Sequence, residues 1–261
     1  MLQLKVYMIF LVFLSVLGLD GQDNQLTTEH EYNFNMGEEL EFELGYGWFT
    51  LGKATASIHD NYVSYTDEAC YKVEIVGRTD GFIGLFAHVK DTWGAFVKPD
   101  NLQPLYSYQD IEEGKYTRNE KTYYNHEKGH IKIIKNDEVK EPKDFEPTKK
   151  VHDILSAYLK VRTIDLGKFK KGDTTLLYTY YDNAFYDLVL KYDGKERIKT
   201  KTPFGKVDAH RVFIMIPKND VFPEEGGVVA WISADQNQLP LKIEAKMFFG
   251  KAYCDLLSYK K

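Results

Sequence analysis

Cysteine is scarce in this chain: Cys70 and Cys254 are the only two among 261 residues. Two cysteines allow one disulfide at most. Strand alternation places Cys70 on the outer face of its strand, whereas Cys254 shares an inner face with apolar neighbours. A bond between an outward thiol and an inward one would need a bulge or a chain end. We therefore expect the two thiols to remain unpaired.

Several signatures of chemistry are also missing. The chain has no Gly-x-Ser-x-Gly elbow, no glycine-rich phosphate loop that opens a helix, and no Cys/His spacing suited to a structural metal. It has no internal repeat and no low-complexity tract. The formal net charge is -5, and no basic stripe runs along any segment. Nucleic acid is therefore not an expected partner, and no cofactor is predicted.

No apolar run reaches the roughly 20 residues that a membrane-spanning helix needs. The longest, "VYMIFLVFLSVLGL", covers about 14 residues after Lys5 and ends in the polar "DGQDNQ". This pattern is typical of a secretory signal peptide, with cleavage after Gly18 or Gly21; the alternative is an uncleaved anchor. We expect a signal peptide over residues 1–21, a flexible segment over 22–36 and one β-rich domain over 37–261. The predicted location is the periplasm or cell envelope of a bacterium, without a transmembrane span after cleavage.

Alternating strands are the clearest pattern in the chain. In "EELEFELGYGW" apolar residues alternate with Glu39, Glu41 and Glu43, a period of two that buries one face of a strand. Similar runs recur up to residues 241–249, on both sides of the charged connector "KNDEVKEPKDFEPTKK" at 135–150. Asp193-Gly194 is predicted to be the tightest turn, and Gly52, Gly114, Gly129 and Gly226-Gly227 are expected to punctuate other strands. The fold class predicted is mainly β, a large antiparallel sheet curled into a sandwich or partial barrel.

One amphipathic helix is expected to pack against this sheet. From Lys150 to about Arg162, apolar residues recur at the spacing of a single helical face. Pro147 lies near its start and Gly167 beyond its end. The helix should act as a lid or plug. A shorter helical patch over Phe82, Leu85, Phe86 and Val89 is predicted to do the same.

The stretch "HEKGH" spells the His-Glu-x-x-His signature of zinc metalloproteases at residues 126–130. That motif binds zinc only on a helix, which brings both imidazoles onto one face. Here the flanks "KTYYN" and "IKIIK" are rich in aromatic and β-branched residues, and Gly129 interrupts the motif. We interpret the stretch as the polar tip of a hairpin, so no metal site is predicted.

A second candidate pair, Asp208 and His210, alternates along a predicted strand and shares one face. Side by side, the two could act as an orienting carboxylate and a base. A cross-strand hydrogen bond or a solvated pair is the more common role for such residues. No catalytic residue is therefore predicted, and the sequence favours a non-catalytic role over an enzymatic one.

Three stretches resemble a known family. They are "GEELEFELGYGWFTLGKATASI", "HDILSAYLKVR" and "VVAWISADQNQLPLKIEAKMFFGKAYCDL", and together the resemblance runs from about Gly37 to Leu257. The chain resembles exported bacterial proteins grouped as domain of unknown function 3108. The resemblance implies a single β-rich envelope domain and supplies no reaction. It singles out positions of unknown role: Asp91, Asp153, Arg162, Trp231, Asp235, Pro240 and Gly250. Asp153 and Arg162 are out of phase on the helix, so each should hold the helix to a different neighbour.

Three functions from different classes remain open. The first is a non-catalytic binding module whose sheet and helix enclose an apolar groove for a lipid, a lipid-linked glycan or another envelope protein. Its support is the aromatic content of 15%, with 19 Tyr and 16 Phe, although a large sheet also needs aromatic residues for its core. The second is an exported hydrolase with a site assembled from scattered residues, which predicts titratable groups in the deepest pocket. The third, a structural subunit of an envelope assembly, predicts an exposed apolar patch and no pocket.

Overall fold

A single sheet of 17 strands dominates the computed structural model, which describes residues 33–84, 88–201, 204–215 and 227–261. The predicted signal peptide and most of the predicted flexible segment lie outside these residues. The strands, in chain order, are Glu39–Tyr46 (β1), Phe49–Ile58 (β2), Val63–Tyr65 (β3), Glu68–Thr79 (β4), Val89–Val97 (β5), Pro104–Glu113 (β6), Tyr116–Asn125 (β7), His130–Lys135 (β8), Glu138–Val139 (β9), Lys143–Asp144 (β10), Val151–His152 (β11), Thr174–Tyr181 (β12), Ala184–Lys199 (β13), Lys206–Met215 (β14), Val228–Ser233 (β15), Pro240–Lys246 (β16) and Lys251–Lys260 (β17). The helices are Gly81–Gly84 (α2) and Ile154–Arg162 (α3), followed by the 3-10 turn Leu166–Lys168 (η1).

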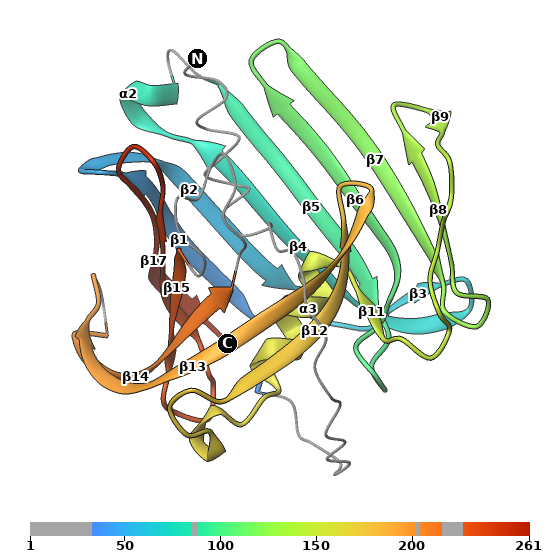
Figure 1. Ribbon diagram of the computed structural model, residues 1–261. Helices are drawn as coiled ribbons and strands as arrows, with labels where there is room; N and C mark the ends of the chain where they lie inside the picture. Colours follow the sequence, from blue (N-terminus) through green and yellow to red (C-terminus); the bar gives the residue numbers. More distant parts are fainter. Residues whose placement is uncertain (1–32, 85–87, 202–203, 216–226) are drawn as a thin grey trace.

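The sheet is continuous and almost wholly antiparallel. Its strands follow one another from β9 through β8, β7, β6, β5 and β4 to β2 and β1, and then from β17 down to β11. Two short strands pair outside this series, β3 with β4 and β10 with β8, and β11 pairs with β12 in parallel. The sheet curls until its two ends approach each other (Figure 1). The predicted mainly β fold with a curled antiparallel sheet is confirmed.

Helix α3 lies inside the curl, between β5 and β12 (Figure 1). Its apolar residues Leu155 and Leu159 are buried against the inner side chains of β4 and β5. Burial of two leucines contributes roughly 2 kcal/mol each to the free energy of unfolding. The predicted role as a plug is therefore confirmed.

The start of this helix differs from the expected residue. Val151 and His152 pair with β12 as strand β11, so the helix begins at Ile154 rather than at Lys150. Asp153 stands at the N-cap and accepts hydrogen bonds from the backbone N–H groups of Leu155 and Ser156. Its side chain thus caps the helix and fixes the residue at which strand β11 gives way to α3.

Three other local predictions were wrong. Asp193-Gly194 is not a turn: β13 continues through it for 16 residues, and Gly194 marks a bulge in the pairing with β14. A tight turn lies instead at Asp182-Asn183, which joins β12 to β13 and has positive φ at both residues. Gly52 lies within β2, and Val89 begins β5 instead of ending a helix. Leu85 and Phe86 of the same predicted patch lie outside the described residues.

Within the described residues, no helix is long and apolar enough to cross a membrane. The connector at 135–150 is less solvated than expected, because Phe145 is buried among the rings and aliphatic side chains that join β7 and β8 to β11 and β12. This cluster holds the two ends of the sheet together.

Candidate functional site

The described pocket lies between the inner face of β5–β7, the start of α3 and the turn between β12 and β13. Strand alternation brings its sheet residues together, because Trp93, Gln109 and Glu120 face one another across three paired strands. Asp182 reaches the pocket from the hairpin turn and Asp153 from the helix cap. The pocket is lined by Trp93, Gly94, Ser107, Tyr108, Gln109, Glu120, Thr122, Tyr124, Asp153, Ile154, Leu155, Tyr180, Tyr181 and Asp182.

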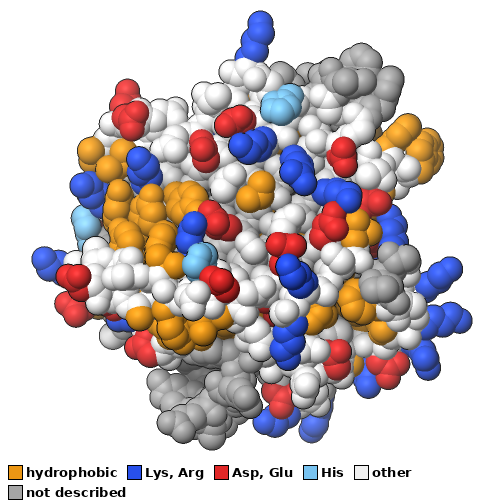
Figure 2. Space-filling model, turned by 180° about the vertical axis from the view of Figure 1, so that it is seen from behind, with side chains coloured by type: hydrophobic (Ala, Val, Ile, Leu, Met, Phe, Trp, Pro, Cys, Tyr) orange, Lys and Arg blue, Asp and Glu red, His pale blue; other side chains and the backbone are white. Residues whose placement is uncertain are grey.

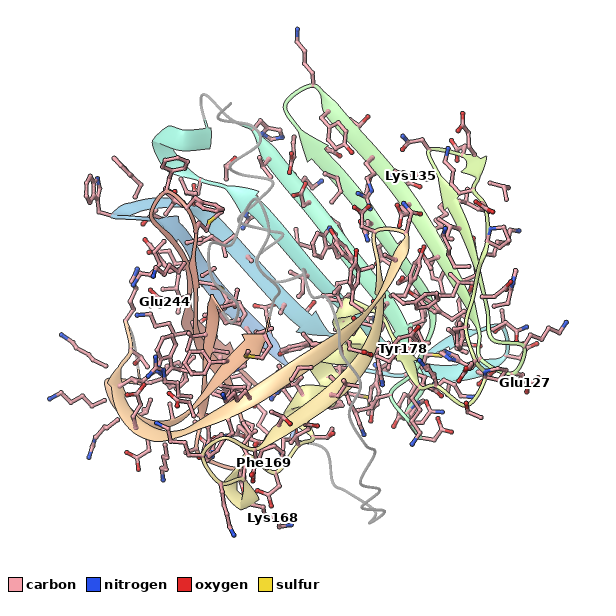
Figure 3. The ribbon with its side chains drawn as sticks, viewed as in Figure 1. Glu127, Lys135, Lys168, Phe169, Tyr178 and Glu244 are labelled. Atoms are coloured by element: carbon pink, nitrogen blue, oxygen red, sulfur yellow. The ribbon has the colours of Figure 1, made fainter. Side chains whose placement is uncertain are left out.

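Arg118, on β7, organises the polar side of this pocket. One terminal nitrogen, Nη2, lies 2.9 Å from Gln109 Oε1 and 3.0 Å from Glu120 Oε2. The other, Nη1, lies 3.4 Å from Asp182 Oδ1. Since Asp182 belongs to the β12–β13 hairpin, this guanidinium joins the two ends of the curled sheet. Lys135 of β8 (Figure 3) adds a second cation, 3.8 Å from Glu120 Oε2.

The pocket is small, and its lining mixes polar groups with aromatic and aliphatic side chains. The centre of a water molecule has about 20 Å³ in which to move, which is room for about one water. The lining includes three carboxyl groups, so the enclosed apolar groove expected from the sequence is not what the described pocket shows. The reason is local: α3 fills the interior beside β5 and β12, and the space left at its amino-terminal end is bordered by carboxyl groups as well as by aromatic and aliphatic side chains.

Each carboxyl group in the pocket already has a structural partner. Glu120 and Asp182 face Arg118, and Asp153 caps its helix. Burial raises the pKa of Asp153, an effect that its hydrogen bonds to Ser156 oppose. His152 beside it is buried, which lowers its pKa to about 3 and keeps the ring neutral. Titratable groups therefore converge here, but in arrangements that hold the fold together rather than leave a base free.

A second buried pair lies farther along the same inner face. Asp91 of β5 and Glu113 of β6 are 2% and 6% exposed. Burial, with the neighbouring Glu113 carboxylate, raises the pKa of Asp91 to about 7. Burial also raises the pKa of Glu113 to about 7, although its hydrogen bond to Asp91 works the other way. Two carboxyl groups this close share a proton near neutral pH. Neither lines the pocket.

The outer face of the same strands carries a different feature, five half-buried aromatic rings. Cross-strand pairing sets Phe96, Tyr106 and Tyr123 in one row, with ring centroids 5.8 and 5.0 Å apart. Tyr108 adds a ring 5.8 Å from Tyr106, and Tyr65 of β3 adds another at 5.3 Å. We call this set the aromatic platform: Tyr65, Phe96, Tyr106, Tyr108 and Tyr123. Figure 2, a view from behind, shows hydrophobic side chains gathered on this side of the molecule.

Three rings of this platform are nearly parallel to one another, and one of them lies over a glycine of the sheet. Tyr108 rests over Gly94, where an added Cβ would stand only 2.1 Å from its ring carbon Cζ, and its hydroxyl donates to Glu74. The Tyr106 ring is inclined by 28° to that of Tyr108, and the Tyr65 ring by 9° to that of Tyr106. Tyr65, Tyr106 and Tyr108 therefore form a series of nearly parallel rings on this face. Burial raises the pKa of Tyr106 to about 12, so its hydroxyl stays protonated.

Charged side chains border the platform. Its central row continues into Lys72 on one side and Lys132 on the other, and Lys132 Nζ lies 5.8 Å from the Tyr123 ring centroid. Lys72 Nζ pairs with Glu74 at 3.2 Å. An apolar surface with a polar border suits a ligand that has apolar ring faces and polar edges.

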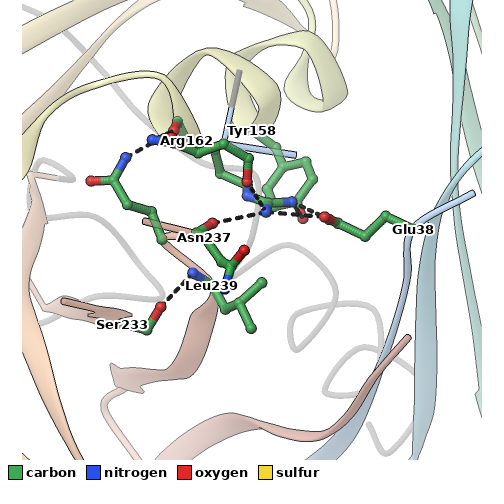
Figure 4. Close-up of polar contacts among 8 residues, drawn as sticks. Glu38, Tyr158, Arg162, Ser233, Asn237 and Leu239 are labelled. Atoms are coloured by element: carbon green, nitrogen blue, oxygen red, sulfur yellow. Dashed lines mark hydrogen bonds and ion pairs between the residues drawn. The ribbon is translucent and has the colours of Figure 1, made fainter. Parts of the chain in front are cut away.

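The positions singled out by family resemblance fall in several places. Asp153 lines the pocket, and Asp91 lies beside Glu113. Arg162 binds Glu38 and the Asn237 carbonyl oxygen, 2.9 Å from its Nη2 (Figure 4). Asp235 accepts from Asn237 N at 3.0 Å, so it shapes the loop that Arg162 holds.

The remaining three positions are structural too. Trp231 donates from Nε1 to Glu196 at 2.6 Å on the outer surface. Pro240 opens β16 opposite Ile232, where the register shifts. Gly250 has a φ of 89° in the turn before β17 and packs against the Tyr46 ring. These seven positions form no single site.

The "HEKGH" stretch forms a hairpin tip, as predicted. β7 ends at Asn125 and β8 begins at His130. His126 lies 2.7 Å from the Pro104 carbonyl oxygen, whereas His130 pairs with Asp144. Gly129 has a φ of 61°, which a turn favours and a helix forbids. Glu127 lies at the outer end of the hairpin (Figure 3). Across the described ranges, no cluster of three His, Cys, Asp or Glu side chains could hold a metal.

The other candidate pairs from the sequence, Asp208 with His210 and Cys70 with Cys254, are not joined in the structure either. Asp208 is exposed and pairs with Lys195 at 3.2 Å, while His210 is buried with Nδ1 at 2.9 Å from the Tyr192 hydroxyl. The two do not work as a pair. Both cysteines are free thiols, and Cys70, expected to face outward, is on the outer face yet buried.

The sequence did not indicate Arg118, Glu120 or the platform. Alternation in "YTRNEKTYYN" makes Arg118 and Glu120 look solvent-facing, because charged residues normally occupy the outer face. On β7, however, Arg118 and Glu120 face inward, whereas Tyr123 faces outward next to Tyr106. The spacing of Tyr106 and Tyr108 two residues apart was the available signal that both lie on one face.

Comparisons with known proteins add a family and a fold. The model of the family described as "Protein of unknown function (DUF3108)" matches residues 41–256. Among solved structures, the chain is similar to a beta-barrel-like protein of domain of unknown function DUF1849 from Brucella abortus. The TM-score is 0.55 at 10% identity, over 87% of this chain and 98% of that one. At this identity the likeness shows the fold alone. No curated protein matches.

Proposed function

Because the chain belongs to the DUF3108 family of proteins of unknown function, we propose a function from its own geometry: a non-catalytic glycan-binding module of the bacterial cell envelope. Its binding surface is the aromatic platform. The observation that carries this proposal is the set of three nearly parallel rings, Tyr65, Tyr106 and Tyr108, laid on an outer face of the sheet. Export is part of the proposal and rests on the amino-terminal apolar run.

A glycan suits this surface better than a free lipid does. The C–H faces of a pyranose ring are apolar and stack on aromatic faces, whereas its hydroxyl edges need polar partners. The platform offers both, since Lys72, Lys132 and Glu74 border the rings. An acyl chain has no polar groups that could bind the charged side chains of the border. A strand of sugars can also extend across the paired strands without entering a cavity.

The hydrolase alternative has less support. The carboxyl groups of the pocket are held by Arg118 or by the cap of α3, and Asp91 and Glu113 are buried outside it. A glycosidase needs two carboxyl groups on either side of a bond that the substrate can reach. The pocket, with room for about one water, does not admit a sugar ring.

The test is binding of the purified protein to an array of bacterial oligosaccharides and polysaccharides. We expect binding to at least one class of glycan, and loss of about thirtyfold in affinity for Tyr106→Ala/Tyr123→Ala, because each stacked ring contributes about 1 kcal/mol. Tyr116→Ala, an exposed tyrosine outside the platform, is the matched control and should bind normally. Absence of any glycan signal, or equal binding by the double variant, would refute the proposal. Shortened oligosaccharides after incubation would indicate the hydrolase instead.

A further inference from the structure

Two neighbouring hairpin tips expose aromatic side chains at one end of the molecule. The β1–β2 tip presents Trp48, 87% exposed, and Phe49, 58% exposed. The β16–β17 tip presents Phe248 and Phe249, 52% and 78% exposed. We call these four residues the aromatic tips. They lie side by side because β1 pairs with both β2 and β17, so that the two turns meet at the same end of β1 (Figure 1).

The tips are joined by their backbones. Gly47 N donates to the Lys251 carbonyl oxygen at 2.8 Å, which links one hairpin to the other. Met247 N donates to Gly250 O at 3.0 Å within the second turn. These main-chain donors therefore already have acceptors inside the protein. The main cost of placing irregular backbone in an apolar medium is leaving its N–H and C=O groups without hydrogen bonds. These two bonds reduce that cost at the tips.

Charge follows the pattern of a membrane interface. Neither tip, residues 46–49 or 247–250, contains a charged side chain. Lys246 and Lys251 flank the second tip and oppose each other in the β16–β17 pairing. Lysines at the base of an apolar projection can reach the phosphates of anionic lipids while the aromatic rings enter the region below. Lys251 Nζ also lies 2.7 Å from Glu244 Oε1, in a half-exposed pair that a lipid phosphate can replace.

We propose that the aromatic tips insert into the interface of a lipid bilayer and hold this protein on an anionic membrane surface. The occupant is a bilayer rather than a second protein, because the tips project from the edge of the molecule (Figure 1) and a bilayer accepts projecting side chains without a matching groove. Tryptophan and phenylalanine are suited to that depth, since they combine a large apolar surface with tolerance of the headgroup region.

The tips and the aromatic platform are separate surfaces. Phe49 begins β2, whereas Ile58 at the other end of β2 pairs with Val73, which in turn faces Ala95 next to Phe96. The ten residues of β2 separate the two surfaces by roughly 30 Å. A protein held at the tips would thus present its platform away from the bilayer surface. Membrane binding does not depend on glycan binding and can be tested without any sugar.

The test is co-sedimentation of the full chain with vesicles of phosphatidylcholine and phosphatidylglycerol. Trp48→Ser/Phe49→Ser/Phe248→Ser/Phe249→Ser should lower the partition coefficient at least about tenfold, because four aromatic side chains leave the lipid. Val139→Ser, an exposed apolar residue on β9, is the matched control and should bind as the native chain does. All variants share one amino terminus, so its apolar run contributes equally to each. Thermal unfolding checks that the quadruple variant is folded.

Two further measurements separate the alternatives. Brominated phosphatidylcholine should quench tryptophan emission in the native chain, and Trp48→Phe should bind vesicles but lose most of that quenching. Lys246→Gln/Lys251→Gln should weaken binding to anionic vesicles and leave binding to phosphatidylcholine alone unchanged. Equal partitioning of the quadruple variant and the native chain would overturn the proposal. So would a native dimer in lipid-free solution that the quadruple variant turns into a monomer, because the tips would then cover a second copy.

Discussion

The Arg162 guanidinium and the Glu38 carboxylate, 124 residues apart in the sequence, form a buried ion pair at the carboxyl end of α3 (Figure 4). Their side chains are 2% and 0% exposed. Arg162 also donates to Asn33 O at 2.7 Å and to Asn237 O at 2.9 Å. Asn33 belongs to the segment predicted to be flexible, yet it is held here together with the buried ring of Phe34. The helix is thereby bonded to the start of β1 and to the β15–β16 loop.

Replacing Arg162 by Leu should lower the free energy of unfolding by about 3–5 kcal/mol, because Glu38 would be left buried without a cation. Urea unfolding of the purified variant measures this change. Glu38→Leu/Arg162→Leu should cost less than Arg162→Leu alone, since no unpaired charge remains. Lys168→Leu, which breaks the exposed pair with Asp165, is the control and should change stability by well under 1 kcal/mol. Unchanged stability of Arg162→Leu would argue for a functional role of that residue.

Asp91 and Glu113 should make the fold less stable as the pH rises. Their pKa values in the folded protein, each raised to about 7, exceed those of unfolded carboxyl groups near 4. The folded state therefore binds protons more tightly, so this stabilisation is complete below about pH 4 and is lost as the pH rises through 7. Between pH 5 and 8 the loss should be roughly 2–3 kcal/mol for each of the two groups.

The Asp91→Asn/Glu113→Gln variant isolates this contribution, because both amides stay neutral. Urea midpoints of the variant and the native chain should diverge in favour of the variant as the pH rises from 5 to 8. Buried His152 acts in the opposite sense: its pKa is lowered to about 3, so its contribution is lost as the pH falls below about 6.5. Both proteins keep His152, which cancels from the comparison. Parallel curves would show that the two carboxyl groups do not share a proton.

Gly94→Ala should disturb the aromatic platform. The new Cβ would occupy the position of the Tyr108 ring and force it off the sheet, away from its hydrogen bond to Glu74. We expect a loss of about 1–2 kcal/mol in the free energy of unfolding and weaker glycan binding. In a Tyr108→Ala background the same substitution should cost almost nothing, since no ring remains to displace. Additive losses in this double-mutant cycle would mean that the ring does not lie over Gly94.

The pattern of apolar residues determined much of the fold by itself. Alternation in residues 39–46 and 241–246 is enough to specify strands, since only a period of two buries one face of an extended chain. The same alternation wrongly placed Trp48 and Phe249 on the buried face, because both belong to exposed turns. The spacing of Ile154, Leu155, Tyr158 and Leu159 likewise specified a helix, and the flanks of "HEKGH" specified a hairpin. These features are local, so a single sequence contains all the information that they need.

The faces and the partners were decided only in the tertiary structure. Alternation shows that a strand has two faces but not which one looks inward, and on β7 the face that carries Arg118 and Glu120 is the inward one. Arg118 thus became buried and Tyr106 half-exposed. The pairing of Arg162 with Glu38, 124 residues apart, depends on residues distant in the chain. Such contacts arise when the sheet closes around the helix, because only then do charged groups of opposite ends leave water together.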